Sequence, residues 1–142
     1  MNSTLVVDTS ALVSIELGEP DASWFAHTLA ASKDTVVSAG SLQELIVVLG
    51  HRRAAKAELS LDFAVGVTTS LLQQGLRIAP IDEGLATLGA ASTLRYRSPP
   101  ARFNLGDGFA YALALQLDAA ILCKGDDFVH ADVRVLQPPG SI

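Results

Sequence analysis

The fold is decided at the start of the chain, by residues 4–12, which read TLVVDTSAL. The β-branched run Thr4–Val7 predicts a short buried strand, because such side chains fit a packed pleated surface. Asp8, Thr9 and Ser10 then offer three good helix N-cap residues, and the apolar positions after them predict a helix. We therefore expect a strand that passes almost directly into a helix.

The same alternation continues to the end of the chain. Further strands are predicted at 35–38, 77–81, 119–123 and 133–136, and helices at 58–74, 82–94 and 107–117. Two more helices are predicted, one that begins near Asp21 and includes Leu29, and one that carries Leu42 to Leu49 and is closed by Gly50. Pro80 favours an edge position for the strand at 77–81, and the arginines and prolines of 95–106 predict a loop. Because the strands are continuously apolar, we expect an α/β fold with a mainly parallel sheet and helices on both faces.

Composition limits the possible classes of protein. The 142 residues are one domain's worth of chain, and 49% hydrophobic against 18% charged residues exclude disorder. A net charge of −5 argues against bulk electrostatic binding of nucleic acid or membrane. A single cysteine, Cys123, excludes disulfides within the chain and zinc sites with several cysteines. With neither a signal peptide nor a membrane span in the pattern, we expect a cytoplasmic protein.

Carboxylates fall where the predicted strands end. Asp8 follows the first strand, Glu44 lies early in the helix after the second, Asp107 begins the helix before the strand at 119–123, and Asp126 and Asp127 follow that strand. Ligands of open parallel sheets bind outside the carboxyl ends of the strands. Clustered carboxylates repel unless cations neutralise them, and Mg²⁺ or Mn²⁺ suits such oxygen ligands. If these segments converge, the sequence predicts a cation site.

Each acid also has an ordinary structural explanation. Asp8 is a good helix cap, residues 41–44 match a capping box, Asp107 complements a helix dipole, and residues 126–127 suit a turn. Taken singly, each acid is more easily explained in this way. Only their joint placement favours a site.

Four segments resemble PIN-domain ribonucleases, and especially the VapC-type toxins of bacterial toxin–antitoxin systems. They are VVDTSAL at 6–12, Glu44 after a strand, RFNLGD at 102–107 and LCKGDDF at 122–128. The resemblance covers nearly the whole chain. It implies that residues 1–142 form a single PIN-like domain, a three-layer α/β/α fold with a sheet of four to five strands. It also implies an endoribonuclease that uses one or two Mg²⁺ or Mn²⁺ ions and leaves 5′-phosphate and 3′-hydroxyl ends.

The resemblance further implies roles for individual residues. Asp8 and Asp107 would be the principal metal ligands, and Glu44 would bind one ion or orient the water. Ser10 would support Asp8, and Asn104 would lie behind the ligands or contact substrate.

The fourth acid departs from the family pattern, which often reads Thr-x-Asp-x-Asp-Phe. Gly125 stands where the first acid of that pattern would be, and Cys123 replaces the threonine. Either Asp126 or Asp127 would carry the role.

The expected partners are RNA, a VapB-type antitoxin and, by the resemblance, a second copy of the chain in a homodimer. The loop with Arg95, Arg97 and Arg102, with Tyr96 between them, is our candidate for phosphate contact or RNA stacking. The apolar residues Trp24, Phe25 and Leu29 form either a docking face for an antitoxin helix or plain core.

Two other functions remain open. A phosphohydrolase or phospho-receiver also places an acid after its first strand, although Ser10 stands where a dehalogenase-like phosphatase needs a second Asp. A catalytically inactive PIN-like binding module would keep the fold without the chemistry.

Overall fold

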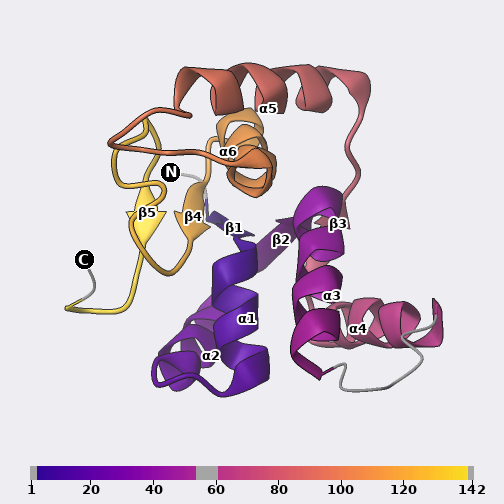
Figure 1. Cartoon of the computed structure of the whole chain (residues 1–142). Helices are drawn as coiled ribbons and strands as arrows, with labels where there is room; N and C mark the ends of the chain where they lie inside the picture. Colours follow the sequence, from indigo (N-terminus) through magenta and orange to yellow (C-terminus); the bar gives the residue numbers. More distant parts are fainter. Residues whose placement is uncertain (1–2, 54–60, 141–142) are drawn as a thin grey trace.

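The computed structural model describes residues 3–53 and 61–140, with eleven helices and strands (Figure 1). In chain order they are β1 (Thr4–Val7), α1 (Thr9–Leu17), α2 (Ala22–Ala31), β2 (Asp34–Ser38), α3 (Ala39–Arg53), α4 (Leu61–Gln73), β3 (Arg77–Ala79), α5 (Glu83–Arg95), α6 (Leu105–Leu117), β4 (Ala120–Leu122) and β5 (Val135–Leu136). The predicted alternation is confirmed. The differences are small: α3 continues past Gly50 to Arg53, α6 begins two residues earlier than predicted, and residues 58–60 lie outside the described residues.

The strands form one parallel sheet in the order β3-β2-β1-β4-β5. β3 lies at an edge, as Pro80 predicts. The chain moves from β1 outward to β2 and β3, and then returns to place β4 on the other side of β1. This reversal makes the carboxyl ends of β1 and β4 neighbours, which is where open α/β sheets bind ligands.

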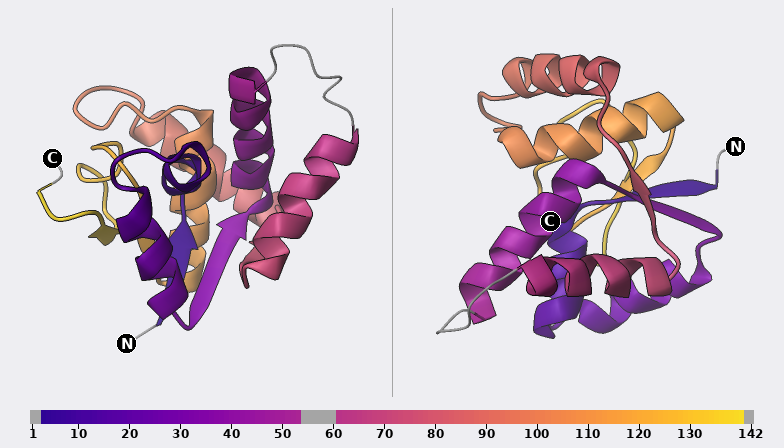
Figure 2. Two further views of the ribbon diagram at one scale, coloured as in Figure 1. Left: turned by 90° about the horizontal axis from the view of Figure 1, so that it is seen from below. Right: turned by 90° about the vertical axis from the view of Figure 1, so that its right-hand side faces the viewer.

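Helices cover both faces of the sheet, as the three-layer prediction requires. The right-hand view of Figure 2 shows α5 and α6 on one side of the strands, and α1, α2 and α4 on the other. Side chains alternate accordingly: Val6 and Ile121 face the α5–α6 layer, whereas Val7 and Leu122 join the core formed with α1 to α4. The central strands β1, β2 and β4 are therefore buried on both faces, which explains their unbroken apolar runs in the sequence.

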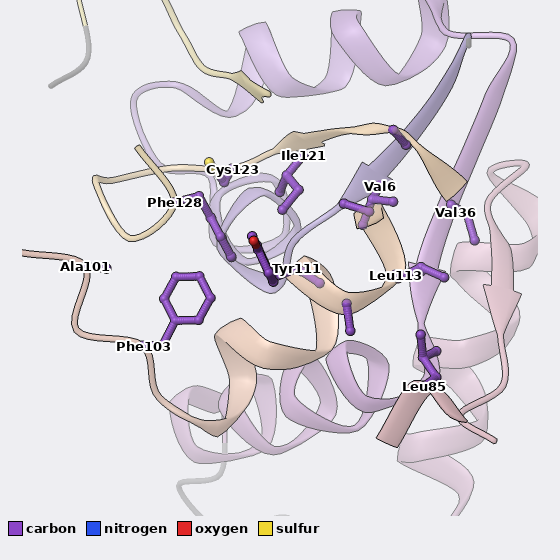
Figure 3. Packing of buried hydrophobic residues seen from close by; sticks show 14 residues of the cluster. Val6, Val36, Leu85, Ala101, Phe103, Tyr111, Leu113, Ile121, Cys123 and Phe128 are labelled. Carbon is purple, nitrogen blue, oxygen red and sulfur yellow. The ribbon is translucent and has the colours of Figure 1, made fainter. Parts of the chain in front are cut away.

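An aromatic group extends the core beneath α6 towards the loop before it. Phe103 lies 5.3 Å from Tyr111 and 5.6 Å from Phe128, measured between ring centroids. Figure 3 shows these three rings in the same buried cluster as Cys123. This packing fixes two polar segments, because Phe103 immediately precedes Asn104 and Phe128 immediately follows Asp127.

No helix in the described part of the chain is long and apolar enough to cross a bilayer.

Candidate active site

Asp8 lies at the junction of β1 and α1, buried with 6% of its surface exposed. Its backbone N–H donates to the Leu122 carbonyl at 2.9 Å, which extends the pairing of β1 with β4. It is the N-cap of α1, and Oδ2 accepts hydrogen bonds from the Ser10 amide at 3.1 Å and the Ser10 hydroxyl at 2.6 Å. Among the described residues both bonds fall on Oδ2, so Oδ1 is left for another partner.

Asp107 occupies the first turn of α6 and is equally buried. Its Oδ2 accepts from the Asn104 backbone at 2.9 Å, and its own N–H donates to the Asn104 side chain at 3.0 Å. This reciprocal capping box fixes where α6 begins and where the carboxylate points. Asn104 therefore orients Asp107, and it is itself exposed.

Glu44 lies one turn inside α3, because the helix begins at Ala39. The capping-box explanation of residues 41–44 is therefore wrong: Ser41 is inside the helix, and its buried hydroxyl has no hydrogen-bond partner among the described residues. The Glu44 carboxylate instead packs on the backbone of Gly106, where an added Cβ would lie 2.8 Å from both Cδ and Oε1. A side chain at position 106 would displace Glu44.

The two remaining acids are placed differently after β4. Gly125 has a φ of 90°, a left-handed conformation that glycine adopts without strain. After this turn Asp126 is exposed, whereas Asp127 is half-buried and carries a hydrogen bond with Asp107. Asp127 also acts electrostatically on Asp8 and Asp107.

The four acids from separate segments form one electrostatic unit. Burial raises the pKa of Asp8 to about 6; the Ser10 hydrogen bonds oppose this rise, and the charges of Glu44 and Asp127 add to it. Burial likewise raises the pKa of Asp107 to about 7, with Asp127, Asp8 and Glu44 contributing. The pKa of Asp127 is also raised, first by burial and then by Asp126. Carboxylates this close and this buried favour a bound cation or a shared proton.

The donor set fits a hard divalent cation, since it consists of carboxylate oxygens at the carboxyl edge of the sheet. Between residues 3 and 53 and between 61 and 140, however, no three His, Cys, Asp or Glu side chains meet at the spacing of a complete metal site. The acids interact through their charges without forming a closed coordination shell.

The basic segment 95–102 precedes Asn104 and Asp107 in the chain; Arg95 is the last residue of α5, so the loop begins one residue later than predicted. Arg95, Arg97 and Arg102 are all exposed, and the guanidinium of Arg95 lies 4.9 Å from the centre of the Tyr96 ring. The loop is closed by a hydrogen bond of 2.8 Å from the Phe103 N–H to the Tyr96 carbonyl. Three positive charges thus stand on the segment that leads into Asn104 and Asp107.

The apolar residues of α2 belong mainly to the core. Phe25 is fully buried, Trp24 packs edge-on against it at 5.3 Å, and Leu29 is partly buried in the same cluster. The plain-core interpretation is therefore correct for Phe25, which cannot receive a partner helix.

Three residues near the acids were missed by the sequence analysis. Gly106 supports Glu44, Lys124 donates its backbone N–H to Ser10, and Gln137 donates its side-chain amide to the Gly125 carbonyl. Lys124 lies 114 positions from Ser10 in the sequence, and Gln137 lies 12 positions from Gly125. No local sequence pattern therefore marks these contacts.

The parallel sheet with carboxylates at its switch point defines a class of α/β proteins with an acidic site. Residues 5–134 match the family model described as PIN domain. "VapC ribonuclease Mb2780c" of Mycobacterium bovis is 32% identical over 133 residues, covering 92% of this chain and 97% of the relative. "Ribonuclease VapC30" of Mycobacterium tuberculosis is 30% identical over 135 residues, covering 95% and 100%. The chain belongs to the PIN-domain family and, within it, to the VapC ribonucleases.

Solved structures agree with the fold. Mycobacterium tuberculosis VapC20, described as a Sarcin-Ricin loop cleaving toxin, superposes with a TM-score of 0.75 at 17% identity, over 94% of this chain and 99% of that one. A toxin–antitoxin complex from Klebsiella pneumoniae gives 0.68 at 17% identity, over 97% and 99%.

Proposed function

We propose that residues 1–142 act as one PIN domain, a metal-dependent endoribonuclease toxin of the cytoplasm. The observation that carries this proposal is that Asp8, Glu44, Asp107 and Asp127 lie close enough to act on one another's charge near the switch point of the sheet, with raised pKa values at both buried aspartates. Asp8 and Asp107 would hold one or two Mg²⁺ or Mn²⁺ ions together with Glu44 and Asp127. Asp126 is exposed and is the weaker candidate.

The protein's own groups would prepare the site for such an ion. Ser10 engages Oδ2 of Asp8, and the backbone N–H of Asn104 engages Oδ2 of Asp107, so each carboxylate would be held in one orientation with Oδ1 left for a cation. When bound, a divalent cation would supply an activated water and neutralise charge on the phosphate. Hydrolysis with release of the 3′-oxygen would leave 5′-phosphate and 3′-hydroxyl ends.

The basic loop would hold the RNA backbone. Arg102 is the nearest of its three arginines in sequence to Asn104 and Asp107, and its exposed guanidinium can pair with phosphate. Tyr96 is already packed against Phe103 and Tyr111, so we assign the loop to phosphate contact and not to base stacking.

The natural regulator would be a VapB-type antitoxin, and the protein would form a homodimer. The similarity to a toxin chain in a toxin–antitoxin complex supports the first. Exposed apolar side chains beside the site support the homodimer. Leu105 is 70% exposed and Val47 is 49% exposed, and both line a groove with Phe109 between α3 and α6.

The direct test is RNA cleavage by Asp8→Asn and Asp107→Asn with Mg²⁺ or Mn²⁺, using Asp132→Asn as a control at an exposed carboxylate. We expect at least a hundredfold loss for the first two and no change for the third, with cleavage abolished by chelation. Chemical analysis of the cut ends tests the product assignment. Full activity in both site variants would exclude the proposal, and absence of metal binding by calorimetry would favour an inactive PIN-like module.

A further inference from the structure

Lys124 lies in the turn between β4 and the acid Asp127, and its backbone reaches the site through Ser10. Its N–H donates to the Ser10 hydroxyl at 2.9 Å. That hydroxyl has a single hydrogen and donates it to Asp8 Oδ2 at 2.6 Å. The Lys124 amide therefore holds the Ser10 oxygen in the orientation that directs its hydrogen at Asp8.

The side chain of Lys124 fixes the position of that backbone. Its ammonium lies 3.0 Å from Oε1 of Glu19 and 3.2 Å from Oδ1 of Asp21, both in the connection between α1 and α2. Asp21 is anchored in turn by the hydroxyl of Ser14, a fully buried residue of α1. The lysine thus ties the turn after β4 to the same helix whose first turn carries Ser10.

The direction of the side chain matters as much as its contacts. Lys124 is three residues from Asp127 and its backbone contacts Ser10, but its ammonium pairs with Glu19 and Asp21. An ammonium bound to Asp8 or Asp127 would neutralise the charge that a divalent cation needs. Glu19 and Asp21 hold the ammonium away from them, and hydrogen bonding to Glu19 is the main cause of the raised pKa of Lys124, which keeps the group charged.

We infer that Lys124 is a positioning residue of the cation site: its ion pairs with Glu19 and Asp21 hold the backbone that orients Ser10 on Asp8. This inference rests on the proposed metal-dependent function. Loss of groups that support metal ligands typically weakens metal binding about 10- to 100-fold. Because Lys124 acts one step further out, we expect Lys124→Met to weaken Mg²⁺ or Mn²⁺ binding about three- to tenfold.

Calorimetric titration of the RNA-free protein with Mn²⁺ tests this expectation. Lys124→Arg keeps both ion pairs and should bind Mn²⁺ as the unaltered chain does. Lys33→Met removes the same charge from an exposed lysine just before β2, at the amino ends of the strands and away from the acids, and should leave Mn²⁺ affinity unchanged. Unaltered affinity in Lys124→Met, or an equal loss in Lys124→Arg, would overturn the inference.

A second measurement needs no metal. Hydrogen exchange by NMR reports protection of the amide at position 124, which depends on its bond to Ser10. Exchange there should accelerate in Lys124→Met and not in Lys124→Arg. Unchanged protection in Lys124→Met would overturn the inference whatever the metal affinity. If exchange accelerates in Lys124→Met as expected, but the unaltered protein neither binds Mn²⁺ nor cleaves RNA, only the proposed function is refuted.

Discussion

Asp8→Asn is predicted to stabilise the metal-free protein at pH 8. Burial raises the pKa of this carboxyl from 3.8 to about 6, so the folded state holds the Asp8 proton more tightly than the unfolded state does. The free energy of unfolding therefore falls as the pH rises between these two values. A shift of about two units corresponds to about 3 kcal/mol lost above pH 6.

Asparagine cannot ionise, so it avoids this loss while remaining a good N-cap for α1. At pH 8 with chelator, Asp8→Asn should exceed the unaltered protein in free energy of unfolding by about 2–3 kcal/mol. At pH 4 the gain should shrink below about 1 kcal/mol, because pH 4 is close to the unfolded pKa and little proton release remains to favour unfolding. Urea denaturation at both pH values measures the difference.

Added Mg²⁺ should cancel the advantage of Asp8→Asn. A ligand at a hundredfold its dissociation constant stabilises the folded state by about 2.7 kcal/mol, and this gain belongs to the protein that retains Asp8. Asp132→Asn, at an exposed position, should change stability by less than about 0.5 kcal/mol. An Asp8→Asn protein that is less stable at pH 8 without metal, or equally stabilised at both pH values, would refute the reasoning.

Other substitutions test single features of the site. Gly106→Ala should preserve or raise thermal stability, since alanine favours a helix over glycine by up to about 1 kcal/mol. The same change should lower RNA cleavage, because the added methyl group displaces Glu44. Undiminished cleavage would show that Glu44 is not part of the site. Asp127→Asn should lower cleavage more than Asp126→Asn does, and the opposite order in the same assay would reassign the fourth acid. Arg102→Gln should raise KM for RNA and reduce the salt dependence of binding by about 0.7 in log–log slope; an unchanged slope would place Arg102 outside the RNA path.

The fold was accessible from the sequence because its signals are local. The β-branched run before Asp8 and the uninterrupted apolar strands predict a parallel sheet covered on both faces, and Pro80 predicts the edge strand. The start of α3 was harder to locate. Residues 41–44 match a capping pattern, but burial of Ser38 and Ser41 against the sheet allows the helix to begin directly after β2, at Ala39.

The site could be predicted only in part from the sequence, because some of its contacts join segments that are far apart in the chain. Acids at strand ends can be found by position, yet the choice between Asp126 and Asp127 depends on the turn made at Gly125, which leaves one exposed and one half-buried. The contact of Lys124 with Glu19 spans 105 positions. Such a pairing has no periodicity and no composition signal, so only the folded arrangement reveals it.

The pairing of Asp8 with Leu122, and of Ser10 with Lys124, has a consequence for synthesis of the protein. Asp8 and Ser10 are translated long before Leu122 and Lys124, their neighbours across the sheet. A nascent chain that ends before β4 has neither the strand that flanks Asp8 nor Asp127. The acidic cluster therefore cannot be complete before β4 and the turn with Asp127 have been translated.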